Sequence, residues 1–314
     1  MARIKILSID GGGIRGIIPA RVMQAIEERA GKPLCQLFDY IVGTSTGGIL
    51  AMGAALPDDK GQPRYRAADG LDFYISGGPR IFPEGPKYVA RQFITAKYPA
   101  RKLEQVFRER FGEATLGDSL TRVLVTAYAT NLSHPKFFKS WDPKDQGYRM
   151  RDVARATSAA PTFFDPVELQ GPKRSYTLID GGVFANNPAM CGLADAIQQN
   201  PDVPLSDFLV VSLGAGDTVY PFVNQFSGLG WGVVEWMIGL RVFHLFLDGS
   251  IDAVTYQLNA ILGPQRFVRF QAPLPDDLSM MDDTYNIPGL LRVANKLVND
   301  QSEQLDRVVE KLLA

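Results

Sequence analysis

The stretch "IKILSIDGGGIRGIIPA" at residues 4–20 joins a short apolar run to three consecutive glycines and then to a helical pattern. The run "IKILSI" is β-branched and nearly continuous, which is typical of a strand buried on both faces. The next segment predicts a helix, with Pro19 in its first turn and Gly31 placed to end it. This order of strand, glycine-rich turn and helix indicates an α/β fold with a site for a negatively charged group at the turn.

The same design recurs in "YIVGTSTGGILAMGAAL", and further strand candidates at 122–130, 175–179 and 208–216 alternate with helical segments. Such alternation predicts a mostly parallel central sheet with helices on both faces, in which the functional loops follow the carboxyl ends of the strands. After residue 216 the alternation fades. We therefore expect one domain over residues 1–314, with an α/β core at 1–216 and a mainly helical part at 217–314 that could include a lid.

The overall charge is balanced, with 33 Lys and Arg against 34 Asp and Glu among 314 residues. This balance offers no general attraction to nucleic acid, so we expect no nucleic acid partner. The charge is nevertheless uneven, because residues 79–110 hold eight basic and three acidic side chains. That stretch is either a solvated surface or a place for anionic headgroups or a nucleotide.

The two cysteines, Cys35 and Cys191, stand among apolar or small residues. This setting favours reduced, packed thiols and a cytoplasmic protein. The first residues run directly into the strand and lack the pattern of a signal peptide. The most apolar stretch, residues 219–247, is interrupted by glycines, Glu235 and Arg241, so no membrane-spanning segment is expected.

The segment "GTSTG" at residues 43–47 matches the G-x-S-x-G turn that presents a serine nucleophile between a strand and a helix. The turn is sharp, and small flanking residues let the backbone pass without burying the hydroxyl of Ser45. At a helix N-terminus, developing negative charge is also favoured. The pattern therefore predicts a nucleophilic Ser45.

A serine nucleophile needs a base, and the chain has only two histidines. His134 stands in an expected turn, and His244 stands in an apolar helical stretch, where packing is the usual role of a histidine. The segment "LIDGG" offers an alternative base, because Asp180 closes an apolar strand directly before two glycines. A turn or cap role is common for Asp. Its position at the same sheet edge as Ser45 favours a Ser–Asp dyad.

The glycine loop "GGGIRG" also satisfies the G-x-G-x-x-G pattern of dinucleotide-binding proteins. That interpretation needs an acid at the end of the second strand, whereas Asp39 begins a strand and belongs to the opposite edge. An oxyanion hole explains the loop together with the other two motifs, because backbone N–H groups of Gly11, Gly12 and Gly13 can converge there. Arg15 would hold the loop or add a positive field.

Together the motifs resemble those of the patatin-like phospholipases, in particular bacterial members: "DGGGIRG" at 10–16, "GTSTG" at 43–47 and "DGG" at 180–182, with "ATSAAPTFF" at 156–164 as a further similar segment. The resemblance covers roughly residues 4–188. It implies a patatin-like three-layer α/β sandwich and a lipid acyl hydrolase, of phospholipase A or lysophospholipase type, that needs no metal or cofactor. It also implies Ser45 as nucleophile, Asp180 as base, and Gly11, Gly12, Gly13 and Arg15 at the oxyanion hole.

The resemblance further implies a phospholipid or other acyl-lipid substrate. Peripheral membrane contact fits Trp231, Trp236, Phe243 and Phe246, which stud residues 219–247. A buried core helix or a dimer face explains the same residues. Some bacterial members resemble effectors that cyclic nucleotides activate, for which the basic stretch at 80–110 is a candidate. Three alternatives remain open at this stage: an acyltransferase using the same dyad, a nucleotide-binding oxidoreductase, and a catalytically silent binding protein.

Overall fold

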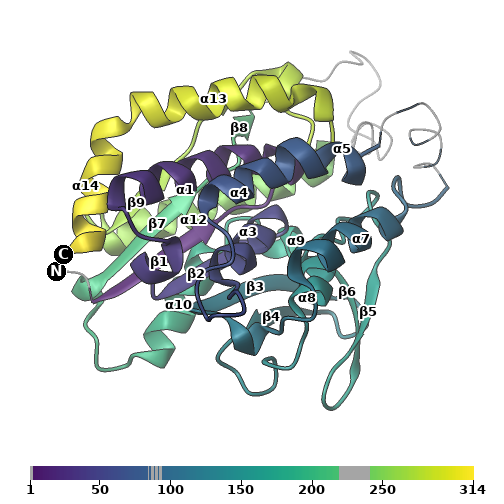
Figure 1. The fold of residues 1–314 in the computed structure, drawn as a ribbon, viewed down its shortest axis with the longest axis horizontal. Helices are drawn as coiled ribbons and strands as arrows, with labels where there is room; N and C mark the ends of the chain where they lie inside the picture. The colour runs from purple at the N-terminus through teal and green to yellow at the C-terminus, as the bar shows by residue number, and fades with distance from the viewer. Residues whose placement is uncertain (1–2, 84, 86–87, 89–90, 92–93, 219–240) are drawn as a thin grey trace, which may run out of the picture.

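The computed structural model describes residues 3–83, 85, 88, 91, 94–218 and 241–314. Its central feature is a sheet in the order β5-β6-β3-β2-β1-β7-β9, with β4 paired to β3 (Figure 1). The strands of this sheet are β1 Ile4–Ile9, β2 Tyr40–Thr44, β3 Arg122–Ala129, β4 His134–Lys139, β5 Val167–Gln170, β6 Ser175–Asp180, β7 Phe208–Leu213 and β9 Phe267–Phe270. A small separate sheet pairs β8 Asp217–Thr218 with β10 Pro273–Leu274.

Helices cover both faces of the sheet. The α-helices are α1 Ile17–Ala30, α2 Leu34–Leu37, α3 Thr46–Ala55, α4 Ala67–Asp72, α5 Gly78–Ile81, α7 Ala100–Phe111, α8 Met150–Thr157, α9 Gly182–Ala185, α10 Ala189–Gln199, α12 Arg241–Leu262, α13 Ile287–Asp300 and α14 Ser302–Leu313. The shorter turns are the 3₁₀ segments η1 Gly13–Gly16, η3 Leu116–Asp118, η4 Leu205–Asp207, η6 Asp276–Leu278 and η7 Thr284–Asn286, and the π-helix η2 Phe73–Gly77.

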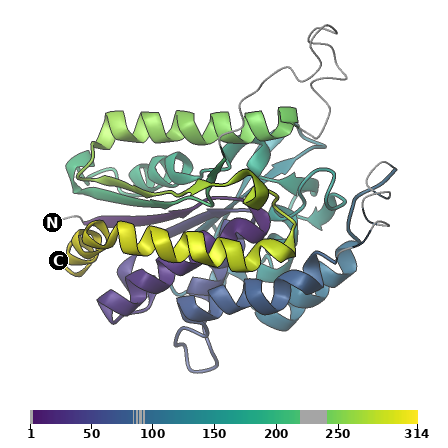
Figure 2. The same cartoon turned by 90° about the horizontal axis from the view of Figure 1, so that it is seen from above.

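The alternation along β1 shows why the fold has three layers. Leu7 and Ile9 belong to the core shared with α1, α3, α13 and α14, whereas Ile4 and Ile6 belong to the core shared with α10 and α12. Figure 2 shows the sheet edge-on, with green α12 on one side and purple α1 with yellow α13 on the other. The expected three-layer α/β sandwich with a helical C-terminal region is therefore confirmed.

The sheet is parallel in its middle and antiparallel at one edge. Parallel pairing joins β2 to β1, β1 to β7, β7 to β9 and β2 to β3, whereas β6 runs antiparallel to β3 and to β5. The sequence signals for α1 are also confirmed: Pro19 lies in the first turn, and Gly31 ends the helix with a left-handed φ of 66°. The N–H of Gly31 donates to the carbonyl of Glu27, as a helix C-cap should.

Candidate functional site

Ser45 and Asp180 come to the same level of the sheet from strands that run in opposite directions. Thr44, at the end of β2, pairs with Thr126 of β3, and the next residue of β3, Ala127, pairs with Asp180. Asp180 therefore lies level with Ser45. The sequence predicts that both residues lie at one edge of the sheet, and they do, although β6 runs antiparallel to β3 and so approaches this level from the opposite direction.

Ser45 occupies the strained backbone conformation that the turn motif requires, with φ 55° and ψ −124°. A Cβ on Gly47 would lie 2.1 Å from the carbonyl oxygen of Ile9, and a Cβ on Gly43 would lie 2.2 Å from the carbonyl oxygen of Gly47. Glycine is therefore required at both positions, because the neighbouring backbone leaves no room for a Cβ atom. The turn is fixed further by the N–H of Ser45, which donates to Oγ1 of Thr157 at 2.8 Å.

Asp180 is almost fully buried, and its surroundings favour the protonated acid. Burial raises the pKa of its carboxyl group to about 7, although hydrogen bonds from the Ser45 hydroxyl and from the Gly182 N–H lower it. The Gly182 N–H lies 2.8 Å from Oδ1. No cation is among the causes of this shift. The two hydrogen bonds alone do not offset desolvation, and the net effect is a raised pKa. A carboxylate with a pKa near neutrality accepts a proton from a hydroxyl better than an ordinary Asp does.

The glycine loop contributes two amides to the site rather than the three expected. The N–H of Gly11 donates to the carbonyl of Asn186 at 3.0 Å, so its expected role as an oxyanion donor is wrong in this structure. Gly12 and Gly13 line the cavity beside Ser45. Within the described residues their N–H groups have no protein acceptor. Gly13 has a φ of 59°, and a Cβ there would lie 2.1 Å from the carbonyl oxygen of Met281.

Charges behind the loop hold it in place. The guanidinium of Arg269, on β9, donates to Oδ2 of Asp10 at 2.7 Å and to Oγ of Ser212 at 2.7 Å. Burial raises the pKa of Asp10, while Arg269 and, more weakly, Arg15 lower it. Arg15 is itself buried, and burial raises the pKa of Asp248 on α12, a rise that the charge of Arg15 partly offsets. Arg15 therefore supplies a positive field beside the loop.

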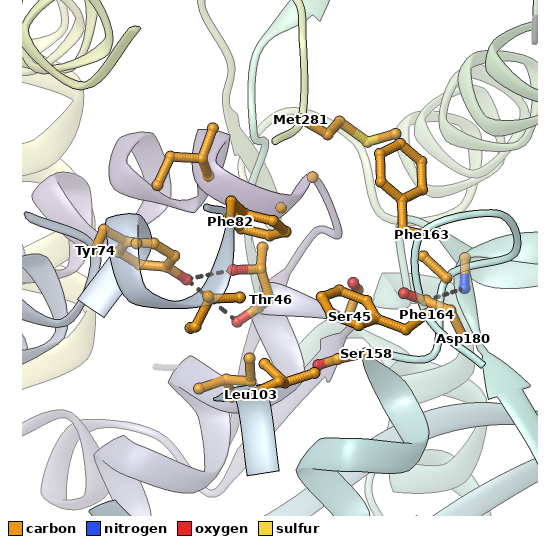
Figure 3. Close-up of a pocket in the computed structure, with 18 of the residues that line it drawn as sticks. Ser45, Thr46, Tyr74, Phe82, Leu103, Ser158, Phe163, Phe164, Asp180 and Met281 are labelled. Atoms are coloured by element: carbon orange, nitrogen blue, oxygen red, sulfur yellow. Dashed lines mark hydrogen bonds between the residues drawn. The ribbon is translucent and has the colours of Figure 1, made fainter. Parts of the chain in front are cut away.

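A cavity opens over Ser45 and Asp180 (Figure 3). About 770 Å³ of empty space lies within it, part of which is open solvent at its mouth. Its wall is largely apolar and includes Ile49, Phe73, Phe82, Leu103, Phe163 and Phe164. The hydroxyls of Thr46 and Tyr74 hydrogen-bond each other at its side. The arrangement suits a long apolar group with one polar, reactive end.

The model of the patatin-like phospholipase family matches residues 7–191, which include all three motifs. The chain belongs to the patatin-like phospholipase family. Patatin-like protein 2 of Arabidopsis thaliana is 32% identical over 292 residues, covering 82% of this chain and 72% of that protein. Patatin-like protein 1 of Oryza sativa subsp. indica is 34% identical, covering 80% and 69%. The crystal structure of VipD from Legionella pneumophila covers 96% of this chain and 67% of that chain, with 13% identity and a TM-score of 0.42.

Membership of this family supports lipid acyl hydrolysis as the general class of activity. The dinucleotide alternative finds no support in the site. Asp39 lies at the opposite edge of the sheet, where its carboxylate accepts the N–H of Lys5 at 2.7 Å. The described residues contain no cluster of three or more His, Cys, Asp or Glu side chains suited to a metal ion.

The other predicted residues lie apart from the cavity or outside the described residues. His134 is the exposed first residue of β4, so the turn expected there is wrong. His244 belongs to α12, of which only the backbone is described at that point, as it is at Phe243 and Phe246. Trp231 and Trp236 lie outside the described residues. No helix in the described part of the chain is long and apolar enough to cross a bilayer.

The cysteines and the basic stretch have protein surroundings of their own. Cys35 and Cys191 are free thiols, and burial raises the pKa of both, which makes them poor nucleophiles. In the basic stretch, Arg80 forms a bidentate ion pair with Glu109, and Lys97 pairs with Asp282. These described basic side chains already have acidic partners.

Several residues that shape the site are not predicted from the sequence. Thr157 and Ser158 belong to the segment "ATSAAPTFF", and Asn186 follows the "DGG" motif. Both places resemble the family, but the sequence alone assigns no role to these three residues. Arg269 and Met281 come from the part of the chain after residue 216, where no motif announces them. Their contacts span more than 250 residues of sequence, which local patterns do not reveal.

Proposed function

We propose that this protein is a serine lipid acyl hydrolase of phospholipase A or lysophospholipase type, with Ser45 as nucleophile and Asp180 as base. The observation that carries the proposal is the position of Ser45, on a strained turn against a buried carboxyl group whose pKa is raised to about 7. Both residues lie in an apolar cavity that Gly12 and Gly13 also line, and the N–H groups of these glycines have no protein acceptor within the described residues. An ester of a long-chain acid fits such a site.

In the proposed cycle, Oγ of Ser45 attacks the acyl carbonyl while Asp180 accepts the hydroxyl proton. The N–H groups of Gly12 and Gly13 stabilise the oxyanion, and each lowers the activation free energy by on the order of 3 kcal/mol. The bond to the leaving alcohol then breaks, and Asp180 returns its proton to that oxygen. Water attacks the acyl-enzyme, its proton passes to Asp180 and then to Ser45, and the carboxylic acid leaves.

Labelling with a fluorophosphonate probe, followed by peptide mass spectrometry, tests the nucleophile. We expect an adduct on Ser45 that disappears in Ser45→Ala and persists in Ser133→Ala. Ser133 is a matched control because, among the described residues, it is the other serine with a positive φ, 52°, and it is exposed outside the cavity. An adduct on another residue, or none on Ser45 in the presence of liposomes, would contradict the proposal.

The base is tested by turnover of a long-chain ester. Asp180→Asn should lose most activity, by about 10²- to 10⁴-fold, because general-base catalysis contributes this much. Retention of most activity by a folded Asp180→Asn variant would exclude the dyad. Product analysis with acceptor lipids belongs to the same experiment: transfer of the acyl group to an alcohol other than water would identify an acyltransferase that uses the same residues.

We also propose that the mouth of the cavity contacts the membrane surface. Ile75 is 43% exposed and Met280 is 48% exposed, and each is the chain neighbour of a residue that lines the cavity, Tyr74 and Met281 respectively. Exposed apolar side chains that adjoin the wall of a lipid site in the chain favour contact with the bilayer interface. Contact at this position would let an acyl chain enter without crossing water.

Liposome co-sedimentation of Ile75→Asp and Met280→Asp tests this contact. Both variants should bind vesicles less and hydrolyse vesicle lipids more slowly, with unchanged turnover of a short soluble ester. Tyr256→Asp is the control, because Tyr256 is 77% exposed on α12 but lies nine residues, about 14 Å, beyond Leu247 of the cavity wall. Equal vesicle binding by all three variants would place the contact elsewhere.

Activation by a cyclic nucleotide is a further part of the proposal, with the basic stretch as the binding region. Arg80 and Lys97 would have to exchange their acidic partners for a phosphate. Thermal unfolding in the presence of a panel of cyclic nucleotides tests this. A rise in Tm with one of them supports it, and no change across the panel counts against it.

A further inference from the structure

Ser158 lies between two contacts that fix the reactive pair. The residue before it, Thr157, accepts the N–H of Ser45 on Oγ1 at 2.8 Å. The residue after it, Ala159, accepts the N–H of Asp180 on its carbonyl oxygen at 3.0 Å. The backbone of Ser158 is therefore held relative to both Ser45 and Asp180 by short hydrogen bonds on either side.

The hydroxyl of Ser158 is buried and has no hydrogen-bond partner within the described residues. The residue is only 8% exposed and lines the apolar cavity over Ser45. Nearby hydroxyls differ in this respect. Oγ1 of Thr44 and of Thr126 hydrogen-bond each other, and Thr157 donates to the carbonyl of Thr126. Because a buried polar group without a partner is costly, a free hydroxyl in a binding cavity indicates a bond made to the ligand.

The position of Ser158 selects which atom of an ester it meets. The glycine loop lies beside Met281, whose carbonyl accepts the N–H of Ile14. In Figure 3, Met281 and Ser158 lie on opposite sides of Ser45. A carbonyl oxygen held by Gly12 and Gly13 therefore points away from Ser158. The oxygen that remains on the side of Ser158 and Asp180 is the one bonded to the leaving alcohol.

We propose that the Ser158 hydroxyl donates a hydrogen bond to the leaving oxygen of the scissile ester. This inference rests on the proposed hydrolase function. As the bond between the acyl carbon and this oxygen breaks, its electron pair moves to the oxygen. Ser158 stabilises that charge and keeps its own proton, while Asp180 supplies the proton that completes the alcohol. In the second half of the cycle, the attacking water occupies the same position.

The dependence of rate on the leaving group tests the proposal. Esters of one acyl chain with an aliphatic alcohol, phenol and p-nitrophenol form a series of increasing leaving-group acidity, and kcat/KM reports the acylation step. Ser158→Ala should lower kcat/KM for the aliphatic ester by about 10- to 100-fold, the size of effect expected for a hydrogen bond to a charged oxygen. The p-nitrophenyl ester should change by less than about threefold, because its leaving group needs little stabilisation.

Ser140→Ala is the matched control, since Ser140 is also 8% exposed but accepts the N–H of Val123 at 2.9 Å away from the cavity. We expect Ser140→Ala to lower Tm, with any loss of kcat/KM equal across the ester series. We expect Ser158→Ala to leave Tm unchanged, with a loss of kcat/KM that depends strongly on the leaving group. An equal loss across the series, or no loss, would overturn the role of Ser158. Failure of the unmodified enzyme to cleave even the p-nitrophenyl ester would instead overturn the hydrolase function.

Discussion

Asp10 and Asp180 are both buried, but different groups accompany their carboxylates. Asp10 forms an ion pair with Arg269, whereas the hydrogen bonds to Asp180 come from the neutral groups of Ser45 and Gly182. The ion pair offsets part of the desolvation cost of Asp10. Asp180 bears that cost without a cation, and this raises its pKa to about 7. The difference is consistent with a structural role for Asp10 and a proton-accepting role for Asp180.

The raised pKa of Asp180 predicts the pH dependence of activity. Only the carboxylate can accept the proton of Ser45, so kcat/KM for a long-chain ester should rise with pH, with a midpoint near 7, and then level off. A pH–rate profile between about pH 5 and 9 measures this midpoint. A profile that is already level at pH 5 would show that Asp180 ionises as an ordinary Asp, with a pKa near 3.8.

The same group predicts a stability gain when its charge is removed. Unfolded Asp loses its proton near pH 3.8, whereas the folded protein keeps it until about pH 7, so the folded state binds more protons in between. Folding stability due to Asp180 therefore falls as pH rises through this window. Asp180→Asn lacks the effect. Calorimetry should show it more stable than the unmodified protein at pH 8, by up to about 4 kcal/mol, with a gap that narrows towards pH 4.

Residue-scale prediction from the sequence succeeded where the constraint is local. The glycines around Ser45 are required by backbone atoms within a few residues or in the neighbouring β1, and "GTSTG" shows this pattern directly. Gly11 is different, because its N–H is engaged by Asn186, 175 residues away. No local pattern distinguishes a glycine whose amide faces a ligand from one whose amide faces another loop. The free hydroxyl of Ser158 is likewise visible only once its surroundings are known.

At the scale of elements, strands and helices with strong periodic patterns were predicted well, and short edge strands were not. The β1–η1–α1 and β2–α3 units follow the expected strand, turn and helix order. Strand β5 has only four residues and was missed, although it forms a hairpin with β6, closed by the N–H of Gly171 donating to the carbonyl of Arg174. This hairpin sets the direction of β6. Without β5, the antiparallel direction of the strand that carries Asp180 into the site could therefore not be inferred.

At the scale of the molecule, the part of the chain after residue 216 completes the site. Strand β9 extends the sheet beside β7, and its Arg269 reaches Asp10 at the base of the glycine loop. The carbonyl of Met281 accepts the N–H of Ile14 from the other side of the loop. The family model ends at residue 191, so Arg269 and Met281 lie beyond the matched region. The loop conformation therefore depends on residues that the shared motifs do not contain.

Replacement of Arg269 tests this dependence. Arg269→Met leaves the charge of Asp10 buried without its partner, which should lower the free energy of unfolding by about 3–5 kcal/mol and slow fluorophosphonate labelling of Ser45. Arg266→Met is the control, because within the described residues the Arg266 side chain donates only to the backbone carbonyls of Leu262 and Leu205, and its loss should cost less than about 1 kcal/mol.

The double variant Arg269→Met with Asp10→Asn separates charge from shape. If the buried charge causes the loss, the second substitution should restore most of the stability, because no uncompensated carboxylate remains. Urea unfolding of the single and double variants measures the free energies, and the labelling rate of Ser45 reports the glycine loop. A normal labelling rate in a folded but destabilised Arg269→Met variant would show that Arg269 stabilises the sheet and does not set the conformation of the glycine loop. Slow labelling that persists in the stable double variant would show that the Arg269–Asp10 pair sets the conformation of the loop itself.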